Sequence, residues 1–231
     1  MQSSAAALIA LATDVLTPVC LFTIWLVAAR NQPTQAAKVW AGLLIVAAGL
    51  LASAMAWYPP LAAIRIQPAP GAQVLVVASI AFVLPLLLLA LPTSRSLLAY
   101  VDPLSVTHLG IWRAVFGSLL LLLGLAGGLP AVFFRSVALG DIAIGLWAIW
   151  IATRTQRVSD RHLLVWNVAG LIDLLHVIPL AVIVLRPFII ANPDAATLNL
   201  LPLVGVPLFI ALHIITIKNL VSKMPMVTDL A

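Results

Sequence analysis

The sequence predicts an all-α, polytopic membrane protein: a seven-transmembrane-helix bundle with its N-terminus outside and its C-terminus cytoplasmic. Of its 231 residues, 64% are hydrophobic and only 8% are charged, whereas a soluble domain is about 45–50% apolar and about 25% charged. Seven apolar runs reach the length of about 20 residues that a helix needs to cross a bilayer. Lys and Arg also gather in alternate connections between these runs, which predicts the orientation.

The predicted spans form a single transmembrane domain and cover residues 5–28, 39–58, 72–91, 108–126, 131–153, 162–185 and 198–218. The fourth and fifth are separated only by the sequence Gly127-Gly128-Leu129-Pro130, which is a strong signal for a tight turn. One helix through both runs would be far too long for a single crossing. We therefore expect two crossings.

The first span is expected to be a helix that the mature protein keeps. No positive charge precedes it, which argues against a cleaved signal peptide. It contains Asp14 and Pro18 within apolar surroundings. Cys20 is the single cysteine of the chain, so an internal disulfide and a cysteine-based metal cluster are both excluded.

Small residues and prolines predict how the spans pack. Small residues recur every seven positions in the second span (Gly42, Gly49, Ala56) and in the fourth (Gly110, Gly117, Gly124). Such stripes allow helix backbones to approach closely. Prolines interrupt the first, third, sixth and seventh spans at Pro18, Pro85, Pro179 and Pro207. Each proline frees backbone carbonyls that neighbours or water must satisfy, which favours a bundle with an interior cavity.

The orientation follows from the basic residues in the connections. With seven spans, one side of the membrane receives eight of them: Arg30, Lys38, Arg95, Arg154, Arg157, Arg161, Lys218 and Lys223. The other side keeps Arg65 and Arg186. The richer side is predicted to be cytoplasmic. The net charge of +5 is therefore interpreted as a topology signal and not as a surface for nucleic acid.

The sixth span carries polar residues deep inside an apolar run. At 1.5 Å per residue, Asp173 lies roughly 16 Å from the cytoplasmic end, Asp141 roughly 18 Å, and Asp14 and His176 roughly 21 Å. Ionisable groups in lipid are costly and usually face the bundle interior. We therefore expect these four residues, which come from three helices, to cluster near the midplane.

The charges of this cluster leave several interpretations open. Three ionised aspartates outweigh the two arginines within the spans, Arg113 and Arg135. Either His176 or one aspartate holds a proton, or a cation lies among them. The first two arrangements describe a proton-handling site and the third a metal or Na⁺ site. A buried hydrogen-bonded network that only fixes helix packing is the alternative.

A second polar group is predicted nearer the cytoplasmic face. His213, Asn167 and Arg113 each lie roughly 7–8 Å deep, with His108 at the boundary. Two histidines with an adjacent arginine would suit a b-type haem, with the arginine pairing a propionate. No cofactor is required by the sequence, and haem is an alternative only.

Several enzyme chemistries find little support, so no catalytic residue is assigned and the chain is not expected to be an enzyme. No span carries the deep lysine that a retinal Schiff base needs. No HExxH or clustered-histidine motif for zinc hydrolysis is present. Ser136 and the other serines within the spans have no paired base at motif spacing, and no Gly-rich phosphate loop occurs.

From His108 to Lys218 the chain carries a recognisable set of residues: Trp112-Arg113, Gly117, Gly128-Leu129-Pro130-Ala131-Val132-Phe133, Gly140-Asp141, Gly145, Trp166-Asn167-x-x-Gly170-Leu171-x-Asp173-Leu174, Pro202, Pro207 and Leu212-His213. This half of the chain resembles a family of small bacterial multi-helix membrane proteins that is uncharacterised. The resemblance implies a bacterial inner-membrane location and no particular activity. Its polar signature positions correspond to Arg113, Asp141, Asn167, Asp173 and His213, and His176 falls outside that pattern.

The sequence therefore predicts a non-enzymatic membrane protein with a midplane polar site. That site would bind a proton, a cation or a small ligand, in transport or in sensing. A haem-, quinone- or pigment-binding redox protein and an accessory subunit of a larger membrane complex are the alternatives. Besides the lipid bilayer, a membrane-protein partner or a second copy of the chain is a candidate partner, and nucleic acid is not.

Overall fold

The computed structural model of the chain describes residues 101–154, 158–192 and 205–223, together with positions 16, 19, 20, 22–24, 26, 27, 34, 39 and 42. These residues form helices and turns, and no strand occurs among them. The third predicted span, nearly all of the second and most of the first lie outside the described residues.

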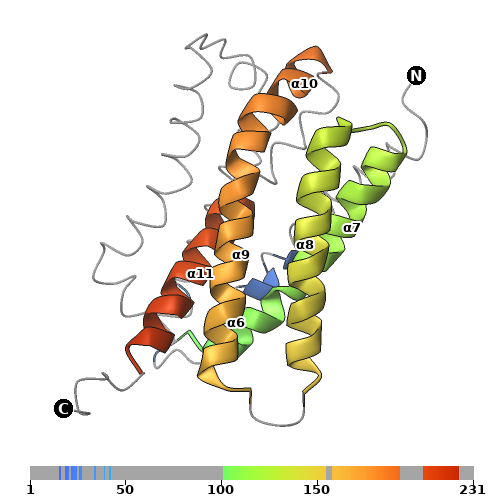
Figure 1. The fold of residues 1–231 in the computed structure, drawn as a ribbon. Helices are drawn as coiled ribbons and strands as arrows, with labels where there is room; N and C mark the ends of the chain where they lie inside the picture. The colour runs from blue at the N-terminus through green and yellow to red at the C-terminus, as the bar shows by residue number, and fades with distance from the viewer. Residues whose placement is uncertain are drawn as a thin grey trace, which may run out of the picture.

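Helices α7 (Ile111–Leu125) and α8 (Ala131–Ala152) form an antiparallel hairpin (Figure 1). A tight turn joins them, as predicted. Gly127 has a φ of 79°, its N–H donates to the Gly124 carbonyl, and the Gly128 N–H donates to the Leu123 carbonyl. This pattern is a Schellman motif, which satisfies the last carbonyls of a helix and stops it. The two predicted crossings on either side of the turn are therefore two separate helices.

The predicted boundary at the start of the fourth span is too late. The helical segment begins at α6 (Pro103–Leu109), which leads through Gly110 into α7. Asp102 caps α6, because its carboxylate accepts a hydrogen bond from the Ser105 N–H at 2.9 Å. Pro103 follows at the first helical position, where its missing N–H costs nothing. Asp102 and Pro103 therefore mark the start of this helix, although a hydropathy pattern leaves both residues outside the span.

The sixth predicted span continues further than expected. Helix α9 (Asp160–Leu180) starts after the N-cap Ser159 and contains Pro179. A π-helical turn, η1 (Ala181–Leu185), follows directly, and α10 (Arg186–Ala191) extends it. Pro179 lacks an N–H and its ring clashes with the preceding turn. The α-helical hydrogen-bonding pattern therefore changes to a π-helical turn after the proline, and the helical segment continues to Ala191.

Helix α11 (Val206–Val221) packs along α9 and closes the described bundle (Figure 1). Residues 198–204 of the seventh predicted span lie outside the described part. Among the described residues, three helical segments could cross a membrane by their length and composition, namely Pro103–Leu125, Ala131–Ala152 and Asp160–Ile189. Val206–Val221 is a shorter apolar helix.

Glycines allow the close approach of these helices. A Cβ at Gly117 would lie 2.9 Å from the Ala138 carbonyl oxygen of α8, and one at Gly124 would overlap the ring of Phe134. A Cβ at Gly110 would overlap the Trp166 ring of α9. The predicted packing role of Gly110, Gly117 and Gly124 is confirmed. Of the corresponding stripe in the second span (Gly42, Gly49, Ala56), only Gly42 lies within the described residues.

Candidate functional site

Arg113 is a buried cation that three helices surround. It projects from α7, and its side chain is 2% exposed. Its Nε–H donates to Asp141 Oδ1 of α8 at 2.8 Å. Its Nη1 donates to the Gly170 carbonyl of α9 at 3.1 Å, and its Nη2 pairs with Asp173 Oδ2. The planar guanidinium thus ties α7 to both neighbours, as its fork of donors allows.

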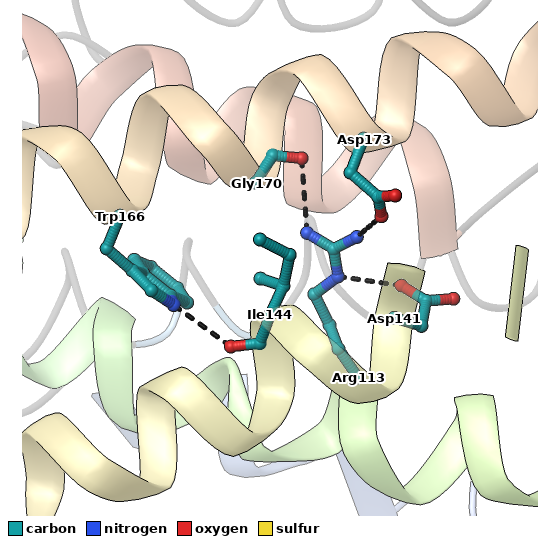
Figure 2. A network of polar contacts seen from close by, with 6 residues as sticks. All are labelled: Arg113, Asp141, Ile144, Trp166, Gly170 and Asp173. Carbon is teal, nitrogen blue, oxygen red and sulfur yellow. Dashed lines mark hydrogen bonds and ion pairs between the residues drawn. The ribbon is translucent and has the colours of Figure 1, made fainter. Parts of the chain in front are cut away.

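The two carboxylates differ from the arginine in their access. The side chains of Asp141 and Asp173 are 14% and 17% exposed. One oxygen of each carboxylate is bonded to Arg113, and the other points away from the guanidinium (Figure 2). The site is therefore a buried cation held between two carboxylates that are themselves only partly buried.

Two glycines make room for this arrangement. A Cβ at Gly140 of α8 would overlap the carboxylate of Asp173. A Cβ at Gly170 would lie 3.1 Å from Nη1 of Arg113 and 2.6 Å from Nε2 of His213. Larger residues at either position would push a charged side chain out of the cluster.

Asn167 and His213 form a second, fully buried pair. The Asn167 amide nitrogen donates to the Leu163 carbonyl at 2.8 Å. Its Oδ1 lies 2.9 Å from Nδ1 of His213. The imidazole also lies beside the Trp166 ring, with ring centroids 5.1 Å apart, and the Trp166 indole N–H donates to the Ile144 carbonyl at 3.0 Å (Figure 2).

The structure joins the two predicted polar groups into one network. Arg113, which the depth estimate assigns to the shallower group, contacts Asp141 and Asp173 of the deeper one. It also lies beside His213 across Gly170. The depth estimate follows Cα positions, whereas an arginine side chain reaches well beyond its own Cα.

His176 has a partner that the sequence did not indicate. Its Nε2 lies 2.7 Å from Ser136 Oγ of α8, and the pair is exposed. Asp173 lies one turn earlier on α9. In the described structure its carboxylate is bonded to Arg113 and not to His176. The pairing depends on how α8 and α9 are rotated about their axes, and helices that are apolar on all sides carry little signal for that rotation.

Two further candidate residues, Arg135 and His108, lie apart from this network. Asp14 lies outside the described residues. Arg135 is exposed over the ring of Phe134, 5.9 Å from its centroid. His108, the second histidine of the haem alternative, is exposed on α6, whereas His213 is completely buried. Across the described positions no group of three His, Cys, Asp or Glu residues is placed to hold a metal ion.

A comparison with protein families gives one match, to a family described as "Domain of unknown function (DUF8737)", over residues 69–221. The match covers more than half of the chain. The chain belongs to this family. No curated protein and no solved structure matches it.

Membership in DUF8737 confirms the expectation of an uncharacterised family, and the match begins earlier than the resemblance at His108. The polar residues of the network all fall within the matched region: Arg113, Asp141, Asn167, Asp173 and His213. These are the five signature positions that the resemblance implied, and the structure brings them together. His176, which falls outside that pattern, is bonded to Ser136 instead.

Proposed function

We propose that this DUF8737 protein is an integral membrane protein whose Asp141–Arg113–Asp173 cluster binds a proton or a small monovalent cation, in transport or in sensing. One observation carries the proposal. A single guanidinium is held between two carboxylates on α8 and α9, so the three groups have a net charge of −1 when all are ionised.

The net charge of −1 matters because Arg113 is buried and both carboxylates are largely buried. A charge in a low-dielectric interior must be neutralised by protonation or by a counterion. Both carboxylates keep one oxygen directed away from Arg113 (Figure 2), and both are partly exposed. The cluster therefore offers an accessible position for one positive charge.

The wider setting remains the one that the sequence predicts. We place the chain in a bacterial inner membrane with seven spans, its N-terminus outside and its C-terminus cytoplasmic. The length and apolar character of Pro103–Leu125, Ala131–Ala152 and Asp160–Ile189 support membrane insertion. The basic residues of the connections support the orientation.

Thermal unfolding of the purified full-length protein across pH, and in sodium or potassium chloride, tests the proposal. We expect the melting temperature to depend on pH or on one of the cations, and we expect this dependence to be lost in Asp141→Asn and Asp173→Asn. Asp160→Asn is the matched control, because Asp160 is exposed at the start of α9. It should keep the wild-type response.

Two results would contradict the proposal. The first is a wild-type protein without any pH or cation response. The second is a pair of aspartate variants that fold normally and respond as the wild type does. An absorption spectrum of the same sample checks the redox alternative, since a Soret band that disappears in His213→Ala would favour haem binding instead.

A further inference from the structure

His213 has one ring nitrogen whose hydrogen-bonding capacity is unused. The Leu163 carbonyl can only accept, so the amide nitrogen of Asn167 must face it and Oδ1 must face the imidazole. Nδ1 of His213 therefore carries a hydrogen and donates it. In the neutral ring, Nε2 is then a bare acceptor. It is completely buried, and the described part of the structure provides no partner for it.

This bare acceptor lies beside the charged cluster. Gly170 separates it from Arg113: a Cβ there would lie 2.6 Å from Nε2 of His213 and 3.1 Å from Nη1 of Arg113. The Gly170 carbonyl also accepts the hydrogen bond from that same Nη1. Arg113, the two carboxylates and His213 therefore form one electrostatic unit that extends from α7 and α8 through α9 to α11.

The charge of this unit is balanced by one proton. Arg113 contributes +1 and the two ionised carboxylates −2, so one added proton makes the four groups neutral. The proton has two chemically suitable positions. One is a carboxylate oxygen of Asp141 or Asp173 on the partly exposed side. The other is Nε2 of His213 on the buried side.

The donor set favours a proton over a metal ion. Arg113 already occupies one oxygen of each carboxylate. Small hard cations need several further oxygen ligands, and the described residues provide no cluster of three His, Cys, Asp or Glu. A proton needs a single lone pair, which Nε2 supplies.

We propose that the ligand of this site is one proton with two alternative positions, an outer one on the Asp141 and Asp173 carboxylates and an inner one on Nε2 of His213. This inference rests on the proposed function and deepens it. In the exchange, an O–H bond of a carboxyl group breaks and an N–H bond forms on Nε2. The carboxyl group becomes a carboxylate, His213 becomes an imidazolium, and the total charge is unchanged.

The position of the proton determines how Arg113 is held. With the proton on His213, both carboxylates are ionised and both bind the guanidinium through charge-assisted hydrogen bonds. With the proton on a carboxyl group, one of these charged bonds weakens. Because charge-assisted hydrogen bonds are about twice as strong as neutral ones, the proton is coupled to the contacts between α7, α8 and α9.

The charged and titratable groups around His213 are those named above, together with the more distant His108 and Lys218. Helix α7 contributes Arg113, which opposes a charged imidazole. Helices α8 and α9 contribute Asp141 and Asp173, which favour it. Helix α6, which packs on α11, contributes only the exposed His108 in this part of the chain, and α11 itself carries Lys218, which is also exposed.

Nitrogen NMR of ¹⁵N-histidine-labelled full-length protein in lipid nanodiscs tests the inference, with infrared difference spectra for the carboxyl groups. As the pH is lowered, we expect the His213 signal to change from a ring protonated at Nδ1 alone to a ring protonated at both nitrogens. In Asp141→Asn the unit is neutral without the added proton. There His213 should stay neutral over the pH range in which the wild-type ring takes up its proton.

Variants of exposed histidines provide assignment and control. His108→Gln, His162→Gln and His176→Gln each remove one signal and so assign the spectrum. His108→Gln and His162→Gln are the controls, because neither side chain contacts the cluster in the described structure, whereas His176 lies one turn from Asp173. Both control variants should leave the His213 titration unchanged.

The outcomes separate this inference from the proposed function. A carboxyl band that titrates while His213 stays neutral at every pH that preserves the fold would overturn the inner position and leave the proposed function intact. If neither the carboxyl groups nor His213 titrates and no cation changes their spectra, both proposals fail.

Discussion

Arg113 makes three hydrogen bonds with one side chain, to Asp141 of α8 and to Asp173 and the Gly170 carbonyl of α9. Lysine could not replace this fork, because an ammonium group is a compact point charge and not a planar set of donors. Gly140 and Gly170 contribute to this arrangement. They keep the volume near the guanidinium free for charged side chains.

Arg113→Gln should destabilise the protein by about 3–5 kcal/mol, since it leaves two partly buried carboxylates without their cation. The stability of Arg113→Lys should lie between those of Arg113→Gln and the wild type. The measurement is thermal unfolding in detergent micelles, and Arg135→Lys is the control because Arg135 is exposed.

The combined variant Arg113→Met, Asp141→Leu, Asp173→Leu distinguishes stability from function. Apolar residues of similar volume often replace a buried ion cluster without loss of stability. We expect near wild-type stability and no proton or cation response. A variant that kept the response would contradict the assignment of the site to these residues.

Gly170→Ala should lower stability by about 1–3 kcal/mol, the usual range for overpacking. The added methyl group would lie 2.6 Å from two atoms of the His213 ring and must displace it or Arg113. Gly205→Ala is the matched control, because a Cβ there meets no atom within 4 Å. Equal melting temperatures for the two variants would show that the space beside Gly170 is not tight.

At the scale of elements, the sequence was most informative where the backbone has special requirements. The turn between α7 and α8 was predictable because Gly-Gly-Leu-Pro leaves few alternatives to a helix stop. The start of α6 was missed, since its signals are the cap Asp102 and the following Pro103 and not hydropathy. The rotation of α8 about its axis was not predictable, so the Ser136–His176 contact was missed as well.

Substitutions at Gly127 test the turn. Gly127→Val should destabilise the protein by about 1–2 kcal/mol, because a φ of 79° places a branched side chain against the backbone. Gly127→Asn should cost much less, since asparagine tolerates this conformation. A comparison of the two melting temperatures checks the prediction. Equal costs would mean that side-chain volume matters here and the backbone angle does not.

At the scale of the whole molecule, four helices share one polar network. Its members could each be named from the sequence, because polar residues within apolar runs are few. The sequence divided them between two depths, however, and it grouped His176 with the carboxylates, whereas His176 pairs with Ser136. Their partners were not predictable. Depth along a helix says nothing about which side chains meet, and the long side chain of Arg113 reaches the deeper carboxylates.

The predicted orientation is testable by labelling with a membrane-impermeant maleimide in a Cys20→Ala background. Ala126→Cys, at the end of α7, should react in intact cells. Arg154→Cys, after the end of α8, should react only once the membrane is permeabilised. The opposite pattern, or an inactive cytoplasmic reporter fused after Ala231, would overturn the orientation.

The short turn between α7 and α8 also has a consequence for biogenesis. Only residues 126–130 join the two helices, so they emerge from the ribosome nearly together and can enter the bilayer as a helical hairpin. Arg113 and Asp141 lie 28 positions apart in the sequence, one on each arm. In such an insertion each charge would accompany its counterion, and neither arm would carry an isolated charge through the lipid.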